Sequence, residues 1–390
     1  MRNLFLELAR YNECFFLGSG TRNHDEQSFQ RFGFSDGYLL QERSKERKGW
    51  ERLIRLSNAR FVEMSSPEYF RAAKSAMIKC SATWNADVLI SFATAVSDVG
   101  ALSDLPKVLD YADSTSLTSR RADAIAWPTM STAEKWAARL RVKRQSGRER
   151  ALVRKYDTTT TISEPDREAL LGVSGVADNR VIVLPNGVSQ DALTCGEAAK
   201  CPDRSIVFWG TLDFPPNYTA VRHFHEKVFM PYLAGRGIDW HIVGAGASQS
   251  LQNDVQHPRI HFHGFVEDLY PFVASKGVMV NPMIQGSGLK NKVLESFALR
   301  LPVVSTCLGV EAIDGEVNTH FLVAEDPGQF ADSIERLLDD HELRASVTRA
   351  GRSLVETRYT WPSIGKRFSD LIQQISCEPR AGRELERISE

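Results

Sequence analysis

The second half of the chain repeats one unit, a short apolar run followed by a helical segment, and this repeat constrains the fold most. The runs are rich in β-branched and aromatic residues, as buried strands are. There are six of them: SIVFWG (205–210), WHIVGAG (240–246), IHFHGF (260–265), VMVNPM (278–283), PVVST (302–306) and FLVAED (321–326). Helical segments follow at 218–235, 266–275, 289–299 and 327–339. Strands that alternate with helices in this way form a parallel sheet covered on both faces.

The first half follows the same pattern less regularly. Its strand candidates are ECFFLG (13–18), ADVLISF (86–92), PKVLDY (106–111), TTTTIS (158–163) and RVIVLP (180–185). We therefore expect a second α/β domain. Two parallel sheets in sequence leave a cleft between the carboxyl ends of their strands, so we expect the ligand site between the two halves.

Turn residues at Pro185-Asn186-Gly187 and a polar stretch at 189–204 separate the halves. The predicted organisation is an N-terminal domain (1–184), a linker (185–204), a C-terminal domain (205–360), a last amphipathic helix (361–376) and a polar tail (377–390). Each of the two large domains is predicted to be doubly wound and Rossmann-like.

Composition excludes several functional classes. Hydrophobic residues make up 42% of the 390 residues and charged residues 25%, and the formal net charge is -1, so no global field attracts nucleic acid. The six cysteines show no CxxC pair, and His261 and His263 alternate on one strand without a third ligand in the pattern, so no metal site is predicted. No apolar run reaches the ~18 residues of a membrane span, and no signal peptide is recognised. We expect a reduced, cytoplasmic setting.

The most informative segment runs from 281 to 304, as a strand, a glycine-rich loop and a helix. Its loop and first helical turn contain Gly286, Ser287, Gly288, Leu289, Lys290 and Lys292. A helix N-terminus presents unpaired N–H groups and a partial positive charge, which suit an anion. Lysines are unfavourable beside such an end unless an anion binds there, and a diphosphate would explain them. The alternative is a tight turn with solvated lysines, one of them paired with Glu295.

These residues resemble a known family. The stretch GSGLKNKVLESFALRLPVVST (286–306) is similar to the donor-binding element of the family 4 retaining glycosyltransferases of GT-B fold. The other landmarks are PNGV (185–188), FWGTLDFPPN (208–217), IVGAG (242–246), HGFVEDL (263–269), GVEAI (309–313) and YTW (359–361). In the first half, VLDYADSTSLTSRRA (108–122) and TISEPDREAL (161–170) carry the resemblance. It implies two Rossmann-like domains that face each other across a cleft, with the N-terminal domain binding the acceptor.

The resemblance implies roles for single residues. Glu295 matches the glutamate that accepts hydrogen bonds from the ribose hydroxyls of the donor nucleotide. Lys290 and Lys292 match basic positions that neutralise the leaving diphosphate. Gly210 matches the glycine that lets backbone approach the phosphates, and the loop residues Gly286 to Leu289 complete the donor site. The donor is a UDP- or GDP-linked sugar, and no cofactor or metal is implied.

Three departures from the family pattern stand out. Where the fuller motif has a glutamate that contacts the donor sugar, eight residues before Glu295, this chain has Ser287. No histidine lies between His24 and His223, so the acceptor-side histidine of many relatives has no counterpart. We place Asp113 opposite the donor instead, with a helix N-cap or turn aspartate as the alternative. The chain also opens on a segment that resembles the helix and strand that follow the first strand in the family. This suggests that roughly 20–30 residues, which would form the first strand and its connection, are missing.

In such a family the sugar is transferred with retention of configuration, and the leaving diphosphate takes the acceptor proton. This chemistry requires positioning and positive charge rather than a strong nucleophile, which favours a metal-independent enzyme. Asp110 and Asp113 leave a metal-dependent enzyme as the alternative. The resemblance implies a glycan or lipid-linked acceptor. The competing hypotheses are a sugar-nucleotide-binding protein without turnover and another GT-B enzyme such as a sugar-nucleotide epimerase.

A basic segment lies in the first half. Residues 134–155 hold nine basic and two acidic residues, interleaved with Trp136, Leu140, Val142 and Leu152. A basic helix of this kind can bind anionic lipid on the inner face of a membrane, where lipid-linked acceptors reside. A solvated helix face and RNA binding are the alternatives, the latter disfavoured because basic and aromatic residues are not interleaved as in nucleic-acid platforms.

Overall fold

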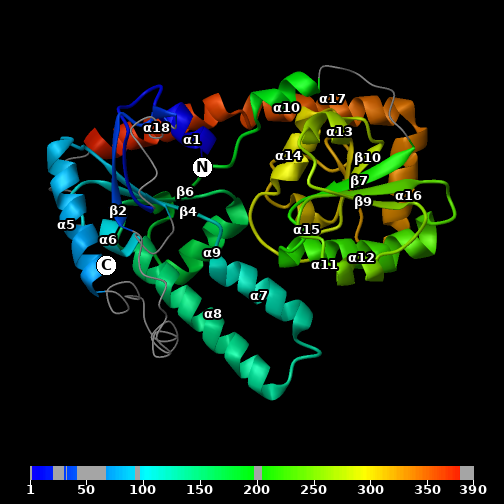
Figure 1. Ribbon diagram of the computed structural model, residues 1–390, viewed down its shortest axis with the longest axis horizontal. Helices are drawn as coiled ribbons and strands as arrows, with labels where there is room; N and C mark the ends of the chain where they lie inside the picture. Colours follow the sequence, from blue (N-terminus) through cyan, green and yellow to red (C-terminus); the bar gives the residue numbers. More distant parts are fainter. Residues whose placement is uncertain are drawn as a thin grey trace. The chain divides into compact units, whose positions relative to one another are not determined.

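The structure is a computed structural model that describes residues 2–20, 30–31, 33–41, 67–92, 97–196 and 204–377. The chain divides into two compact units: unit 1 comprises Met1–Pro185 and Pro362–Glu390, and unit 2 comprises Asn186–Trp361. Each unit is an α/β layer structure built on parallel strands (Figure 1). Residues 378–390 of the predicted tail (377–390) and residues 197–203 of the linker lie outside the described residues, while Cys377 belongs to the last helix.

Unit 2 contains one six-stranded parallel sheet with the order β12-β11-β10-β7-β8-β9. Its strands are β7 (Ser205–Trp209), β8 (Asp239–Val243), β9 (Ile260–Gly264), β10 (Val278–Asn281), β11 (Val303–Ser305) and β12 (Leu322–Val323). All six strands predicted in this half are confirmed. The first strand of unit 2, β7, lies in the middle of its sheet, with β8 on one side and β10 on the other.

Helices cover both faces of this sheet (Figure 1). They are α10 (Gln190–Cys195), α11 (Pro215–Phe224), α12 (Gln249–Asp254), α13 (Leu269–Ala274), α14 (Asn291–Ala298), α15 (Cys307–Val310), α16 (Pro327–Asp339) and α17 (His341–Arg358). α11 continues into a π-helical segment, His225–Leu233. One face packs against α11 and α16 through a core that contains Phe208, Trp240 and Phe224. On the other face α14 packs against α17, where Gly351 lies directly on the Phe297 ring.

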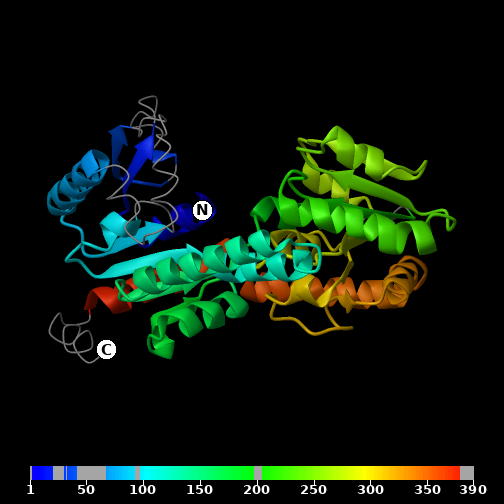
Figure 2. The same ribbon diagram turned by 90° about the horizontal axis from the view of Figure 1, so that it is seen from below.

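Unit 1 differs in that its described strands form two separate parallel sheets, β1-β2 and β3-β4-β5-β6 (Figure 2). The strands are β1 (Phe15–Gly20), β2 (Asp36–Gln41), β3 (Leu89–Phe92), β4 (Lys107–Ala112), β5 (Thr158–Thr161) and β6 (Val181–Val183). β2 was not predicted. Among the described residues, β1 and β3 each end a sheet. The missing first strand stays a prediction.

The helices of unit 1 include the last helix of the chain. They are α1 (Arg2–Leu8), α5 (Pro67–Thr83), α6 (Ser97–Gly100), α7 (Thr115–Ala126), α8 (Thr132–Val153), α9 (Glu164–Ser174) and α18 (Trp361–Cys377). α18 contacts α1 so closely that a Cβ on Gly365 would lie 2.3 Å from Glu7 Cβ. Asn12 Nδ2 donates to Ser369 Oγ at 2.9 Å beside this contact.

In unit 2, the polar linker contains a helix that its sequence pattern does not predict, α10. Ser189 caps this helix.

Candidate functional site

The connections that follow β7 and β10 lie side by side at the carboxyl edge of the unit 2 sheet. β7 and β10 are neighbours, yet the chain leaves them in opposite directions, toward β8 and toward β11 (Figure 1). Such a reversal of strand order opens a crevice at the ends of the two strands, where ligands bind in doubly wound sheets. The predicted donor residues Gly210 and 286–295 all lie on these two connections or on the helix that follows the second one.

The glycine loop between β10 and α14 has the backbone that its glycines predict. Gly286 has a φ of +106° and Gly288 a φ of +73°, conformations in which a side chain would be strained. The loop is tied to α11 because Gln285 Nε2 donates to Pro215 O at 3.0 Å and to Thr219 Oγ1 at 2.8 Å. Ser287 is partly exposed and Leu289 is buried. These hydrogen bonds bring the predicted loop, residues 286–289, close to the connection that follows β7.

Gly210 directly follows β7, at a point where three chain segments meet. A Cβ here would lie 2.7 Å from Asn217 Nδ2 and 3.3 Å from Lys292 Nζ. On the neighbouring connection, a Cβ on Gly244 would lie 1.9 Å from Gly210 O. Only glycines allow the backbone and these polar groups to approach so closely.

Lys292, the second residue of α14, points its ammonium at this turn. Nζ donates to Asn217 Oδ1 at 2.8 Å and lies 4.0 Å from the centre of the Phe208 ring. Burial and the nearby Lys290 lower the pKa of Lys292 to about 7, while Glu295 opposes the shift. A cation is thus held in an apolar, partly enclosed position, where an anion would be bound strongly.

Lys290 is placed differently from the prediction, because α14 begins at Asn291 and Lys290 precedes its first turn. Its ammonium donates to Ser287 O at 2.7 Å and to Gly288 O at 2.8 Å, and the side chain is buried. These bonds close the glycine loop on itself. Within the described residues no side chain caps the start of α14.

Glu295 lies one turn further along α14, with its carboxylate held by two aromatic donors. Trp209 Nε1 donates to Glu295 Oε2 at 3.1 Å, and the Tyr270 hydroxyl is a second donor. Burial raises the pKa of Glu295 above its ordinary value, although the bonds from Trp209 and Tyr270 and the charge of Lys292 act against this shift. The carboxylate is therefore desolvated and fixed, ready to accept hydrogen bonds from a ligand.

The sequence patterns did not identify two residues of this site as functional, Asn217 and Tyr270. Asn217 lies in the landmark FWGTLDFPPN, and a polar residue one turn into a helix after two prolines is a usable signal. Tyr270 follows the landmark HGFVEDL, in the helix α13, and nothing in its local pattern points to Glu295.

Asp113 belongs to unit 1, where it is exposed directly after β4. The alternative that it caps a helix is wrong, because Ser114 caps α7 by accepting from Leu117 N at 3.2 Å. The backbone around Asp113 is firmly held: Ala112 has a φ of +58°, and Ser114 N donates to Asp166 Oδ1 at 2.8 Å. Its position opposite the donor stays a prediction.

Asp110 and the histidines of β8 and β9 are residues that could serve as metal ligands. Burial raises the pKa of Asp110, which accepts from Thr160 Oγ1 at 3.0 Å. The histidines of β8 and β9 bond among themselves, with His241 Nδ1 2.8 Å from His263 Nε2, while His261 Nε2 lies 3.0 Å from Asp239 Oδ1. The part of the chain that the structure describes contains no group of three or more His, Cys, Asp or Glu residues placed to hold a metal ion.

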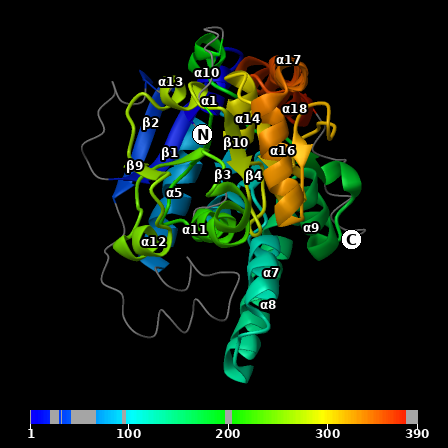
Figure 3. The same ribbon diagram turned by 90° about the vertical axis from the view of Figure 1, so that its right-hand side faces the viewer.

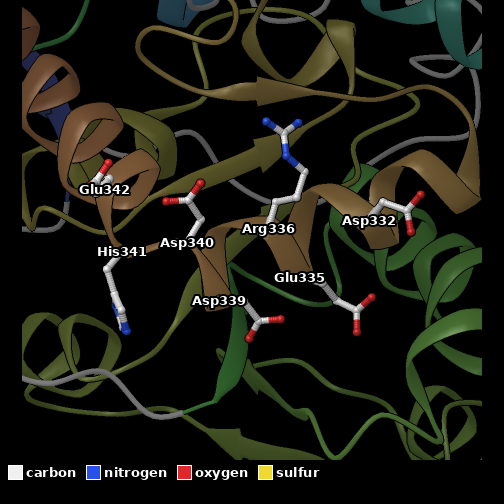
Figure 4. A pocket seen from close by; sticks show the side chains of 7 residues that line it. All are labelled: Asp332, Glu335, Arg336, Asp339, Asp340, His341 and Glu342. Carbon is white, nitrogen blue, oxygen red and sulfur yellow. The ribbon is translucent and has the colours of Figure 1, made fainter.

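A hollow of about 720 Å³ on unit 2 is a poor candidate for binding a nucleoside diphosphate (Figure 4). Its lining residues are mostly acidic: Asp332, Glu335, Arg336, Asp339, Asp340, His341 and Glu342. Two of these acids are already ion-paired, Glu335 with Arg236 and Asp339 with Arg204. An acidic hollow repels a nucleoside diphosphate.

The basic segment forms α8, which pairs with α7 in a long arm of unit 1 (Figure 3). Trp136 is 66% exposed near the start of α8. Two of the basic residues are ion-paired within unit 1, Arg141 with Asp123 and Arg148 with Asp98. None of the helices among the described residues is long and apolar enough to span a membrane.

Part of unit 2 resembles known proteins in sequence. Residues 203–340 match the sequence model of the family described as glycosyl transferases group 1. Over 126 residues the chain is 29% identical to the capsular polysaccharide biosynthesis glycosyltransferase CapM of Staphylococcus aureus, a match that covers 30% of this chain and about a third (33%) of that relative.

Solved structures resemble nearly the whole chain. HepE from Anabaena, in complex with UDP and glucose, has a TM-score of 0.63 at 11% identity and covers 96% of this chain and 95% of its own. The sucrose-phosphate synthase of Thermosynechococcus elongatus has a TM-score of 0.66 at 16% identity, with 96% and 92% covered. WaaG, a glycosyltransferase involved in lipopolysaccharide biosynthesis, has a TM-score of 0.59 at 14% identity, with 95% and 94% covered. The chain therefore has the GT-B fold of two Rossmann-like domains, and its residues 203–340, which contain the candidate site, resemble the group 1 glycosyltransferases.

Proposed function

We propose that the protein is a retaining glycosyltransferase of family 4, which moves a sugar from a nucleotide-sugar donor to a glycan or lipid-linked acceptor. One observation carries this proposal: within a group 1 domain, the strand-order reversal gathers a glycine loop, a partly enclosed cation and a fixed carboxylate. The solved HepE complex contains UDP and glucose, which supports a uridine nucleotide as the first donor to test.

In the proposed complex Glu295 binds the ribose. Its carboxylate is held by Trp209 and Tyr270, so its remaining acceptor capacity has a defined direction. Ribose hydroxyls would donate to it in charge-assisted hydrogen bonds. The Gly210 turn, the loop from Gly286 to Leu289 and the first N–H groups of α14 would receive the diphosphate.

The proposed reaction breaks the bond between the sugar's anomeric carbon and the diphosphate oxygen. The acceptor oxygen forms the new bond on the same face of the sugar, and the acceptor proton passes to the leaving diphosphate. Lys292 would stabilise the negative charge that grows on the diphosphate, so we propose a metal-independent reaction. Asp113 would orient the acceptor hydroxyl.

The first experiment is a thermal-shift screen with UDP, GDP and ADP, followed by nucleoside diphosphate release from the matching sugar nucleotides. A ligand that is present at 100 times its Kd stabilises the protein by about 2.7 kcal/mol. Stabilisation by UDP or GDP with release supports the proposal. Stabilisation without release in the presence of membrane and glycan acceptors would support a binding protein without turnover, and interconversion of the sugar would indicate an epimerase. No stabilisation by any nucleotide would contradict all three.

We also propose a cytoplasmic location, with the α7–α8 arm bound to the inner face of a membrane. The exposed Trp136 supports this proposal, because an aromatic ring on a basic helix suits an anionic lipid interface. A lipid-linked acceptor would then lie at the surface to which the enzyme is bound.

A further inference from the structure

Asn217 links the two connections of the donor site and is almost fully buried. It lies in the first turn of α11 with 8% of its surface exposed. Its Nδ2 donates to Thr211 O at 2.9 Å, and its Oδ1 accepts from Lys292 Nζ at 2.8 Å. A carbonyl can only accept and an ammonium can only donate, so the two partners fix the orientation of the amide.

Close packing also restricts the position of this amide. The Nδ2 atom would lie 2.7 Å from a Cβ on Gly210, so glycine at 210 and asparagine at 217 fit as a pair. The centre of the Phe208 ring lies 4.0 Å from the ammonium nitrogen and presents an apolar surface to it. A lysine side chain has four rotatable bonds, and here its head is confined by one amide, one ring and one glycine turn.

We propose that Asn217 is a positioning residue, which holds the Lys292 amino group at the Gly210 turn so that an entering diphosphate meets it already in position. This inference rests on the proposed donor site and adds to it a residue that touches the ligand only through Lys292. Preorganisation of this kind lowers the entropy that binding would otherwise cost.

The charged groups that face Lys292 predict a second property. Lys290 on the glycine loop repels the ammonium, Glu295 on α14 attracts it, and burial lowers its pKa to about 7, against an ordinary 10.5. A diphosphate at the turn would restore the high pKa. Diphosphate binding at a pH above the lowered pKa of Lys292 would therefore be coupled to proton uptake.

The first test needs no nucleotide. Protein labelled with ¹³C at the lysine ε-carbon is titrated by NMR, and the Lys292→Met variant identifies the Lys292 signal. We expect that signal to titrate near pH 7, to titrate lower in Asn217→Ala because an acceptor for the charged form is lost, and higher in Asn217→Asp because an anion is added. Asn253→Ala, at an exposed asparagine of α12, is the matched control and should change nothing. A Lys292 signal with the ordinary titration of lysine, or one that neither Asn217 variant moves, would overturn the inference.

The second test uses UDP. Calorimetry at pH 8 in two buffers of different ionisation enthalpy counts the protons taken up on binding. We expect uptake in the parent, none in Lys292→Met, and less in Asn217→Asp; Asn217→Ala should bind UDP about tenfold more weakly. UDP binding without proton uptake contradicts the inference and leaves the proposed function standing. If UDP and GDP do not bind while the Lys292 signal responds to Asn217, the nucleotide assignment fails and the positioning role stands.

Asn217→Ala could fold poorly because it empties a buried position. Asn217→Asp has nearly the same shape and keeps the experiment decisive, since its effect on the Lys292 titration has a definite sign. Circular dichroism of each variant shows whether unit 2 has kept its structure.

Discussion

The two units use the same parallel architecture but complete it differently. Unit 2 has one uninterrupted sheet of six strands, with its site at the reversal between β7 and β10. The described strands of unit 1 form sheets of two and four strands, and its polar residues serve the structure itself. The comparison shows that a polar residue can serve a ligand site only if some of its hydrogen-bonding capacity is unused and accessible.

Two glutamates, one in each unit, make this contrast concrete. Glu149 in unit 1 is fully buried, and its Oε1 accepts from Ser114 Oγ at 3.0 Å, from Thr115 Oγ1 at 3.0 Å and from Ser116 N at 2.9 Å. It closes the N-terminus of α7, and although its Oε2 has no hydrogen-bond partner among the described residues, that atom is fully buried and no ligand can reach it. Glu295 in unit 2 has aromatic donors and a half-buried side chain beside Lys292, so it has capacity left for a ligand.

The largest expected effect comes from the core that supports the unit 2 sheet. Trp240 is fully buried, with its ring centre 4.8 Å from that of Phe224 and 5.5 Å from that of Phe229. Trp240→Ala should lower the free energy of unfolding by about 3–5 kcal/mol and remove nucleotide binding with it. Urea unfolding followed by circular dichroism measures the loss.

Trp240→Phe is the matched variant for this experiment. Within the described residues Trp240 Nε1 is a buried donor without a hydrogen-bond partner, so phenylalanine loses no bond and should cost less than about 1.5 kcal/mol. Equal costs for the two substitutions would show that the ring does not hold the sheet together.

The glutamate comparison predicts an effect on binding alone. Glu295→Gln keeps the side-chain shape but loses a charge-assisted acceptor, which should cost about 1.5–3 kcal/mol, or roughly ten- to a hundredfold in nucleotide affinity. Glu149→Gln should leave that affinity unchanged, whatever it does to stability. Calorimetry with UDP measures both. If Glu295→Gln binds as tightly as the parent while folded, the donor site has been assigned to the wrong element.

The α7–α8 arm provides a prediction about the membrane. Arg141 and Arg148 are tied to Asp123 and Asp98, so changing them would also disturb unit 1. Changing Lys143 and Arg144 to Gln should weaken the binding free energy to anionic liposomes by about 1 kcal/mol per charge, so that less protein sediments with them. Added salt should also weaken this binding. Turnover of a soluble acceptor should not change. An unmutated protein that stays in the supernatant with these liposomes would refute the membrane proposal.

The smallest effect concerns the histidines of β8 and β9. Burial lowers the pKa of His241 to about 4, helped by Lys276, His263 and His261 and opposed by Asp239, and the pKa of His263 is lowered too. The unfolded chain therefore binds more protons between pH 6.5 and pH 4, so stability is full above this window and falls as the pH drops through it.

Because the cluster is partly exposed, we expect a loss of about 1 kcal/mol between pH 7 and pH 5.5, or about 3 °C in Tm. His241→Gln should reduce this pH dependence. Melting curves of both proteins at the two pH values test it, and an identical pH dependence would exclude His241 as its source.

Most of the fold could be predicted from local patterns. The six strands of unit 2 are buried runs whose period and flanking turns are visible in the sequence, and α16 begins and ends where its pattern predicts. β2 was missed because its run, DGYLLQ, is short and starts with two residues that are rare in strands. The polar linker concealed α10, since a helix of six residues is too short to show a period.

What the sequence determined by itself is the set of residues that must act locally. Gly286 and Gly288 shape the loop, and Lys292 and Glu295 share one face of a helix because they are three residues apart. The tertiary structure decided how they are used. It places Asn217 on Lys292 across 75 residues of chain and Trp209 on Glu295 across 86, and it turns Lys290 back onto its own loop. The physical reason is that burial and hydrogen bonding depend on which strands become neighbours, and no local period specifies that order.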